Sequence, residues 1–113
     1  MLVTLNYKKN DVLTIKLSTG EEIVARFDSF DTQNTLDVIK PTVLTLNPQT
    51  GAVMLIPWIM SIDVKSSEPV KIKQSQIVAI AKPNKQVSGM YMQGTSGIAM
   101  PDAMDTEART SLL

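Results

Sequence analysis

The 113-residue chain contains no cysteine and no histidine. Without cysteine there can be no disulfide, no thiolate zinc site and no cysteine nucleophile. Without histidine the chain lacks the commonest metal ligand and the general base of every Ser-His triad. Catalysis would have to rely on carboxylates, lysines or hydroxyls alone. We therefore predict that the chain is not an enzyme and that it holds no metal and no cofactor.

Charge of one sign is not in excess, because eleven basic side chains balance eleven acidic ones. This balance argues against a broad cationic field of the kind that coats DNA. It hides a segregation, since residues 11–37 hold six acidic and two basic side chains, whereas residues 64–86 hold five lysines and one glutamate. If the two segments lie on opposite faces, the later one would attract phosphate. Scattered, solvated charges are an equally good interpretation.

Residues 41–62 carry no charge, which raises the question of a membrane span. Three prolines and a turn signal at residues 47–51 interrupt this stretch, and the apolar run that remains, residues 52–60, is too short to cross a bilayer. The N-terminus has no basic region followed by an apolar block, so we expect no secretion signal. The sequence predicts a cytoplasmic protein without a membrane partner.

Apolar residues that alternate along residues 11–28 predict two half-buried strands joined by a turn at Thr19 and Gly20. The side chains predicted to face inward are Leu13, Ile15, Leu17, Ile23, Ala25 and Phe27. Those predicted to face outward on the second strand are Val24, Arg26 and Asp28. A third strand is expected over residues 36–46, with a bulge or bend at Pro41 because proline cannot donate to a ladder.

The run at residues 52–60 is apolar at nearly every position, so both of its faces need cover. A polar loop at residues 63–69 and a last short strand at residues 77–81 follow. Asn84 is expected to cap one or two helical turns that end by Met92. Residues 94–113 have the composition of a flexible tail, which leaves residues 1–93 as one domain.

Five short strands with almost no helix predict an all-β fold, a small, strongly bent open barrel of the SH3 or Sm type. An apolar edge strand is an aggregation hazard unless another copy covers it, and closed symmetry is the soluble way to do so. We therefore expect a homo-oligomeric ring. Its predicted interface consists of Met54, Ile56, Trp58, Ile59, Met60, Ile77 and Ala79. Core filling within one subunit is the alternative role for Trp58.

A motif in residues 13–38 resembles the first motif of the Sm and Sm-like proteins. Its matching positions are Leu17, Gly20, Ile23, Ala25, Phe27, Phe30 and Asp31, followed by Leu36 and Val38. The family's second motif is similar to residues 72–80, where Lys73 keeps the cation and Gln74 replaces a glycine. Residues 1–97 also resemble Sm-like proteins of cyanophages and marine environmental sequences, with a Gly-Glu-Glu-Ile hairpin, an Asn-Pro-Gln-Thr-Gly turn and a Pro-Trp strand.

The resemblance implies a five-stranded Sm-like barrel whose ring binds single-stranded nucleic acid in its pore. The residues that it places at this site are Asp31, Gln33, Asn34, Thr35, Lys73 and Ser75. The slots for the stacking and base-reading residues hold Gln33 and Thr35, so we expect a weaker uridine preference than is usual in the family. Plain turn chemistry is the alternative for residues 33–35, and a solvated surface lysine is the alternative for Lys73.

Two functions follow as expectations. The first is an Sm-like ring that binds single-stranded RNA, or DNA, in RNA processing or regulation. The second is a structural or adaptor ring that binds another protein through Trp58, the tail or residues 63–70. The resemblance to phage proteins places the chain in the cytoplasm of a bacterium, or of the host cell if it is encoded by a phage.

Overall fold

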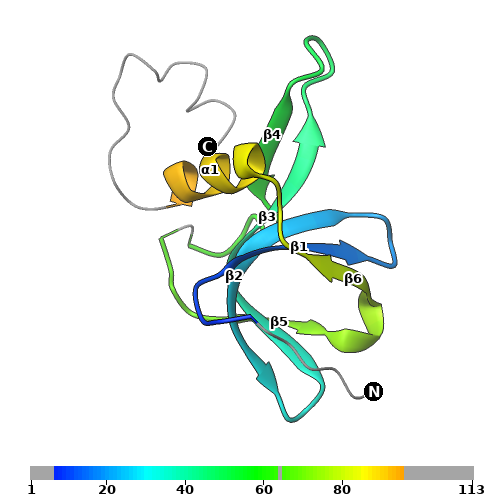
Figure 1. Cartoon of the computed structure of the whole chain (residues 1–113), viewed down its shortest axis with the longest axis vertical. Coiled ribbons are helices and arrows are strands. Elements are labelled where there is room, and N and C mark those ends of the chain that lie inside the picture. Colours follow the sequence, from blue (N-terminus) through cyan, green and yellow to red (C-terminus); the bar gives the residue numbers. More distant parts are fainter. Residues whose placement is uncertain (1–6, 64, 96–113) are drawn as a thin grey trace.

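The computed structural model describes residues 7–63 and 65–95, which form a bent antiparallel sheet and one helix (Figure 1). The strands are β1 (Val12–Leu17), β2 (Glu22–Asp31), β3 (Thr35–Leu46), β4 (Val53–Pro57), β5 (Val70–Lys73) and β6 (Ile77–Ala81). A single 3-10 turn (Gln74–Gln76) joins β5 to β6, and α1 (Lys85–Thr95) follows. The all-β class is confirmed, but the sheet has six strands and not five.

The alternation of β1 and β2 places the expected side chains inside the barrel. The core cluster contains Leu13, Ile15, Leu17, Ile23, Ala25, Phe27, Leu36, Val38 and Ile72. Gly20, with φ +101°, allows the tight turn between β1 and β2. Val24 lies on the opposite face of β2, as predicted, yet it is fully buried, because α1 covers that face.

Strand β3 bends sharply in its middle, as the proline predicted. Arg26 pairs with Ile39 and Val24 pairs with Thr42, so Lys40 and Pro41 together lie opposite a single residue of β2. This extra residue is a β-bulge, and Lys40 adopts the left-handed conformation there, with φ +51°. The bend divides β3 into a barrel half and a projecting half.

The two halves of β3 pair with different strands, which explains the sixth strand. Residues 42–46 pair with β4, whereas residues 35–38 pair with β5. The strand predicted over residues 52–60 is shorter in the structure, because β4 covers only Val53–Pro57. Further along the chain, β5 pairs with the same edge of β3. Pairing with β3 continues through β5, whose four residues the sequence analysis did not identify as a strand.

The sheet runs in the order β4-β3-β2-β1-β6, with β5 added beside the barrel half of β3. The 3-10 turn brings the chain from β5 to β6 without hydrogen bonds between these strands, so the barrel is open (Figure 1). The hairpin of β3 and β4 projects from the barrel. Its tip is a tight turn in which the Asn47 side chain accepts hydrogen bonds from the backbone N–H groups of Gln49 and Thr50.

Helix α1 begins at the expected cap, where the Asn84 side chain accepts a hydrogen bond from the Val87 N–H (2.8 Å). It is longer than predicted and includes Gly94 and Thr95, so the rest of the expected tail, residues 96–113, lies outside the described residues. Val87 and Tyr91, one turn apart, pack against Val24 and Leu55 in a second apolar cluster. Within the part of the chain that is described, no helix has the length and hydrophobicity to span a membrane.

Candidate nucleic-acid interface

The β2–β3 turn and the end of β5 lie side by side, although they are about forty residues apart in the sequence. Thr35 is the cross-strand partner of Lys73. The backbone N–H of Gln74 donates to the carbonyl oxygen of Asn34 (3.0 Å), which fixes the 3-10 turn against the β2–β3 turn. The structure therefore brings the two predicted halves of the site together at one end of the barrel.

The β2–β3 turn is organised by the side chain of Asp31. Its Oδ1 accepts hydrogen bonds from the backbone N–H of Gln33 (3.0 Å) and from the hydroxyl of Thr32 (3.3 Å). Asn34 adopts φ +69°, a conformation that asparagine tolerates better than most residues. The side chains of Gln33 and Asn34 are exposed. Asp31 thus shapes the turn, whereas the two amide side chains face solvent.

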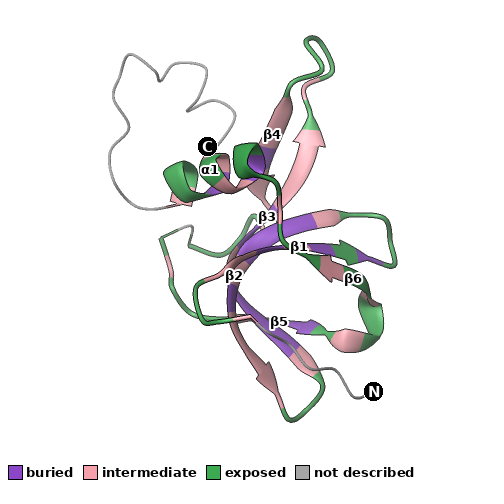
Figure 2. Cartoon of the chain, viewed as in Figure 1, coloured by how far each residue is buried: buried purple, intermediate pink, exposed green. Residues whose placement is uncertain are grey.

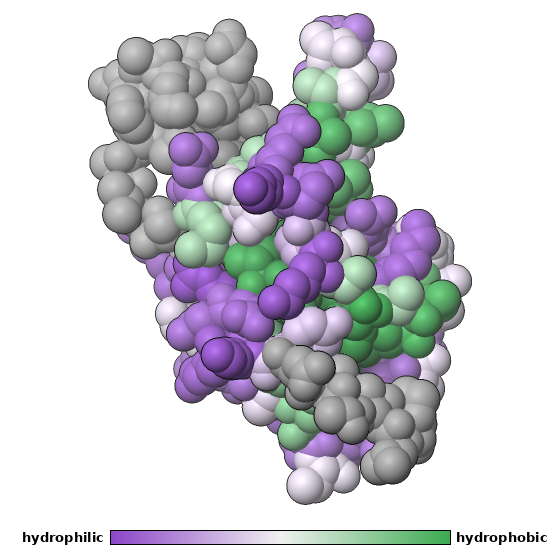
Figure 3. Space-filling view, viewed as in Figure 1, coloured by the Kyte–Doolittle hydropathy of each residue, from purple (hydrophilic) through white to green (hydrophobic). Residues whose placement is uncertain are grey.

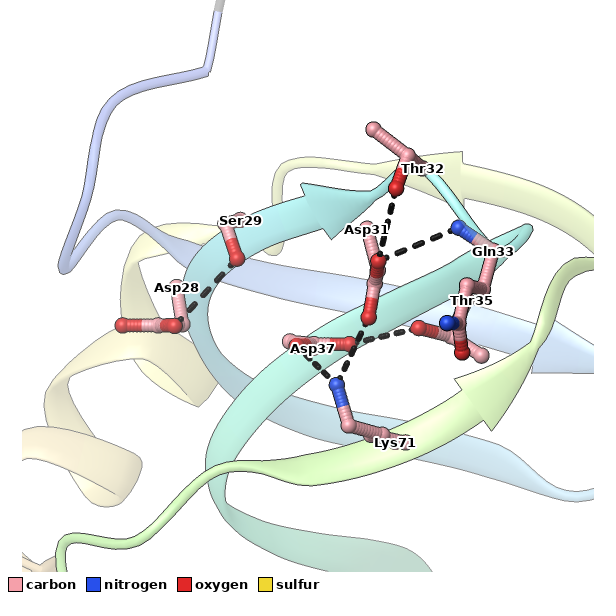
Figure 4. Close-up of polar contacts among 8 residues, drawn as sticks. All are labelled: Asp28, Ser29, Asp31, Thr32, Gln33, Thr35, Asp37 and Lys71. Atoms are coloured by element: carbon pink, nitrogen blue, oxygen red, sulfur yellow. Dashed lines mark hydrogen bonds and ion pairs between the residues drawn. The ribbon is translucent and has the colours of Figure 1, made fainter.

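Lys71 of β5 forms two ion pairs beneath this turn (Figure 4). Its Nζ lies 2.8 Å from Oδ2 of Asp31 and 2.9 Å from Oδ2 of Asp37, and the Thr35 hydroxyl donates to the other oxygen of Asp37 (2.7 Å). The hydrogen bond from Lys71, aided by that from the Gln33 N–H, lowers the pKa of Asp31. The same contacts with Asp31 and Asp37 raise the pKa of Lys71.

Lys71 and Asp37 were missed in the sequence analysis. No sequence signal indicated the burial of Asp37, because its alternation with Leu36 and Val38 predicts that it faces away from the barrel core, where a carboxylate needs no ion-pair partner. The partner itself was not identifiable without the β3–β5 pairing. Thr35 and Asp31 were predicted to contact nucleic acid, but their polar groups are engaged in this cluster, which leaves them a supporting role in the turn.

The acidic and basic segments of the sequence are neighbours and do not lie on opposite faces. β5 belongs to the basic segment and pairs with β3, which begins in the acidic one. The charge of Lys71 is paired with those of Asp31 and Asp37, whereas Lys73 is exposed and has no ion pair within residues 7–63 and 65–95. Beside it, Ser75 is also exposed. Among the described residues at this end of the barrel, the ammonium group of Lys73 and the side-chain amides of Gln33 and Asn34 are therefore exposed to solvent.

The chemistry available at this site is hydrogen bonding and charge. Amide groups can donate to and accept from base edges, and an ammonium group can contact phosphate. The turn offers no aromatic ring for stacking, as its sequence indicated. Among the described residues, no group of three or more His, Cys, Asp or Glu side chains is placed to hold a metal ion.

Four of the seven predicted interface residues lie on β4 and β6, the first and last strands in the order β4-β3-β2-β1-β6. Met54 and Ile56 belong to β4, and Ile77 and Ala79 belong to β6, at the opposite end of the strand order. All four are at least partly exposed in the structure. Val78, which is 67% exposed, was missed in the sequence analysis and lies on the same β6 edge.

The residues after Pro57 divide into two kinds. Trp58 packs against the barrel core, and its indole N–H donates to Oε2 of Glu21 (3.2 Å), so part of its surface is covered within the same chain. Ile59 is partly exposed, and Met60 is 79% exposed.

Comparison with protein-family models and with curated protein sequences identifies no match to this chain.

Proposed function

We propose that this chain assembles into an Sm-like ring that binds single-stranded nucleic acid, RNA in preference to DNA. The observation that carries the proposal is the pairing of Thr35 with Lys73. It places the exposed side chains of Gln33 and Asn34 close to the exposed ammonium group of Lys73, an arrangement that a ring would repeat in every subunit. The spacing from Leu17 to Asp31 that resembles the Sm motif supports it, as does the strongly bent antiparallel sheet.

Assembly would pair the β4 edge of one copy with the β6 edge of the next. Both strands are five residues long and carry no charged side chain, so neither has the charges that usually protect an edge strand. Hydrophobic side chains gather along the projecting hairpin and again beside β6 (Figure 3). Because the two edges lie at opposite ends of the sheet, their contact is head-to-tail, and such contacts form a ring when the rotation closes.

Nucleic acid would contact the repeated sites through two kinds of group. Lys73 provides one phosphate contact per subunit, and Gln33 and Asn34 provide hydrogen bonds to base edges. Stacking of a base on an aromatic ring contributes about 1–3 kcal/mol, which this turn cannot supply. Affinity then depends on several weak contacts made at once around the ring, so it should be modest and strongly dependent on salt.

Fluorescence anisotropy with labelled oligo-U, oligo-A and single-stranded DNA tests the binding. We expect saturable binding at low salt and a weak preference for uridine. Lys73→Met should weaken binding to all sequences alike and reduce the salt dependence, since it removes only phosphate contacts. Lys85→Met, at the exposed start of α1, is the matched control and should leave binding unchanged. Absence of salt-sensitive binding at micromolar protein would refute nucleic-acid binding.

Light scattering after size-exclusion chromatography tests the assembly. We expect the unmodified protein to run as a single closed oligomer. Val78→Lys should leave a folded monomer, because Val78 is largely exposed in the subunit but would be covered at the β6 edge. Circular dichroism of the variant confirms that the subunit is still folded. A monomer for the unmodified protein at all concentrations would contradict the ring.

A protein-binding ring is the second candidate, favoured by the uncharged segment at residues 41–62, much of which projects as the β3–β4 hairpin (Figure 1). Interface cores are depleted of charged residues, so this hairpin would suit a protein surface better than a phosphate backbone. An assembled protein that fails to bind any oligonucleotide would favour this candidate over the first.

A further inference from the structure

Helix α1 lies in the angle between the barrel and the projecting hairpin (Figure 1). Its buried side chains, Val87 and Tyr91, belong to one apolar cluster with Val24 of the barrel strand β2 and Leu55 of the hairpin strand β4. Figure 2 shows that the buried part of α1 faces the base of the hairpin. The helix therefore contacts both of the parts that the bend in β3 separates.

The bend itself is a strained point in the backbone. Lys40 has φ +51°, in the left-handed region that residues other than glycine rarely adopt, and such a conformation persists only where the surroundings hold it. Pro41 follows it and cannot donate a backbone hydrogen bond.

The last turn of α1 holds these strained residues directly. The Tyr91 hydroxyl lies 2.8 Å from the carbonyl oxygens of both Ile39 and Lys40, which share its single donor hydrogen. In the other direction, Nζ of Lys40 donates to the carbonyl oxygen of Thr95 (3.0 Å). The Thr95 hydroxyl in turn donates to the Tyr91 carbonyl oxygen (2.6 Å). Helix and bend thus form one hydrogen-bonded unit.

We propose that α1 is a brace that fixes the direction of the β3–β4 hairpin, and with it the direction in which the free β4 edge meets a second copy of this chain. The consequence for assembly rests on the proposed ring, because closure of a head-to-tail contact depends on the rotation between neighbouring copies. The helix contains Gly89 and Gly94, and its buried side chains among the described residues are Val87 and Tyr91, so its hold on the hairpin depends on few contacts.

Distance measurements between two spin labels test the brace in the full chain. The protein has no cysteine, so Thr50→Cys at the hairpin tip and Thr32→Cys at the barrel end give the only labelling sites. Labelled protein is diluted into unlabelled protein so that distances between copies do not contribute. We expect one narrow distance distribution, which Tyr91→Phe should broaden roughly twofold by freeing the bend. Lys40→Met should broaden it in the same way.

Tyr7→Phe is the matched control, because Tyr7 contacts Phe27 in the barrel and not α1. It should leave the distribution narrow. Unchanged widths in both Tyr91→Phe and Lys40→Met would overturn the brace, even if the protein forms a ring. If the unmodified protein is a monomer, the proposed ring is wrong. The widths of the distance distributions would then still show whether α1 fixes the direction of the hairpin. If both hold, light scattering of Tyr91→Phe should show smaller or mixed oligomers.

Discussion

Alkaline pH should destabilise this protein through one side chain, Tyr91. Burial raises the pKa of its hydroxyl from 10.0 to about 12, against the opposing effect of the nearby positive charge of Arg26. The folded state therefore disfavours the tyrosinate, whereas the unfolded chain ionises near the ordinary value. The stabilisation is complete below pH 10 and is lost progressively as the pH rises to about 12.

The size of the effect follows from the shift. A difference of about two pKa units at about 1.36 kcal/mol each gives a loss of roughly 2–3 kcal/mol in the free energy of unfolding across this window. Tyr91→Phe removes the titrating group and should abolish this loss. At neutral pH the variant should be less stable by about 1–2 kcal/mol, because the carbonyl groups of Ile39 and Lys40 lose their donor.

Urea denaturation at a series of pH values from neutral to alkaline measures both quantities. The unmodified protein and Tyr91→Phe are compared at each pH, so that the titration of lysines is common to both. Ultraviolet absorbance of the Tyr7→Phe variant follows the ionisation of Tyr91 alone, since the chain has two tyrosines. Parallel loss of stability in the two proteins above pH 10 would refute the assignment.

Two further predictions concern the site and the hairpin. The hydrogen bond from Lys71 lowers the pKa of Asp31, so the ionised Asp31 carboxylate stabilises the fold above the ordinary carboxyl pKa, and this stabilisation is lost as the pH falls below about 4. Asp31→Asn should therefore flatten the acid side of a plot of melting temperature against pH. Leu55→Ala should cost about 2–5 kcal/mol in chemical denaturation, because Leu55 is fully buried under α1. Leu46→Ala, at an exposed position of the same hairpin, should change stability by less than about 0.5 kcal/mol, and equal costs would contradict this packing.

Local patterns predicted much of the barrel. The alternation in β1 and β2 identified their buried face, because side chains of a strand point to opposite sides in turn. Pro41 indicated the bulge in β3, since proline removes a ladder hydrogen bond. The residues at 47–51 predicted a turn for equally local reasons, and Gly51 adopts φ +75° there.

Other features depend on contacts between distant parts of the chain. Outward-facing Val24 is buried only because α1 crosses β2, which the alternation of β2 itself cannot indicate. Strand β5 is four residues long with two lysines, too short and too polar to be identified without its partner β3. The role of Trp58 also required the fold, because its hydrogen bond partner Glu21 lies in the turn between β1 and β2.

At the candidate site, too, some features follow from the local sequence and others from contacts between distant parts of the chain. The sequence by itself determined which residues form the β2–β3 turn and that this turn carries amides and no aromatic ring, because composition and turn preference act over a few neighbouring residues. Only the tertiary structure decided that Lys71 pairs with Asp31 and Asp37, while Lys73 has no ion pair among the residues that the structure describes. The register between β3 and β5 sets that difference, and register is a property of two paired strands that neither strand contains alone.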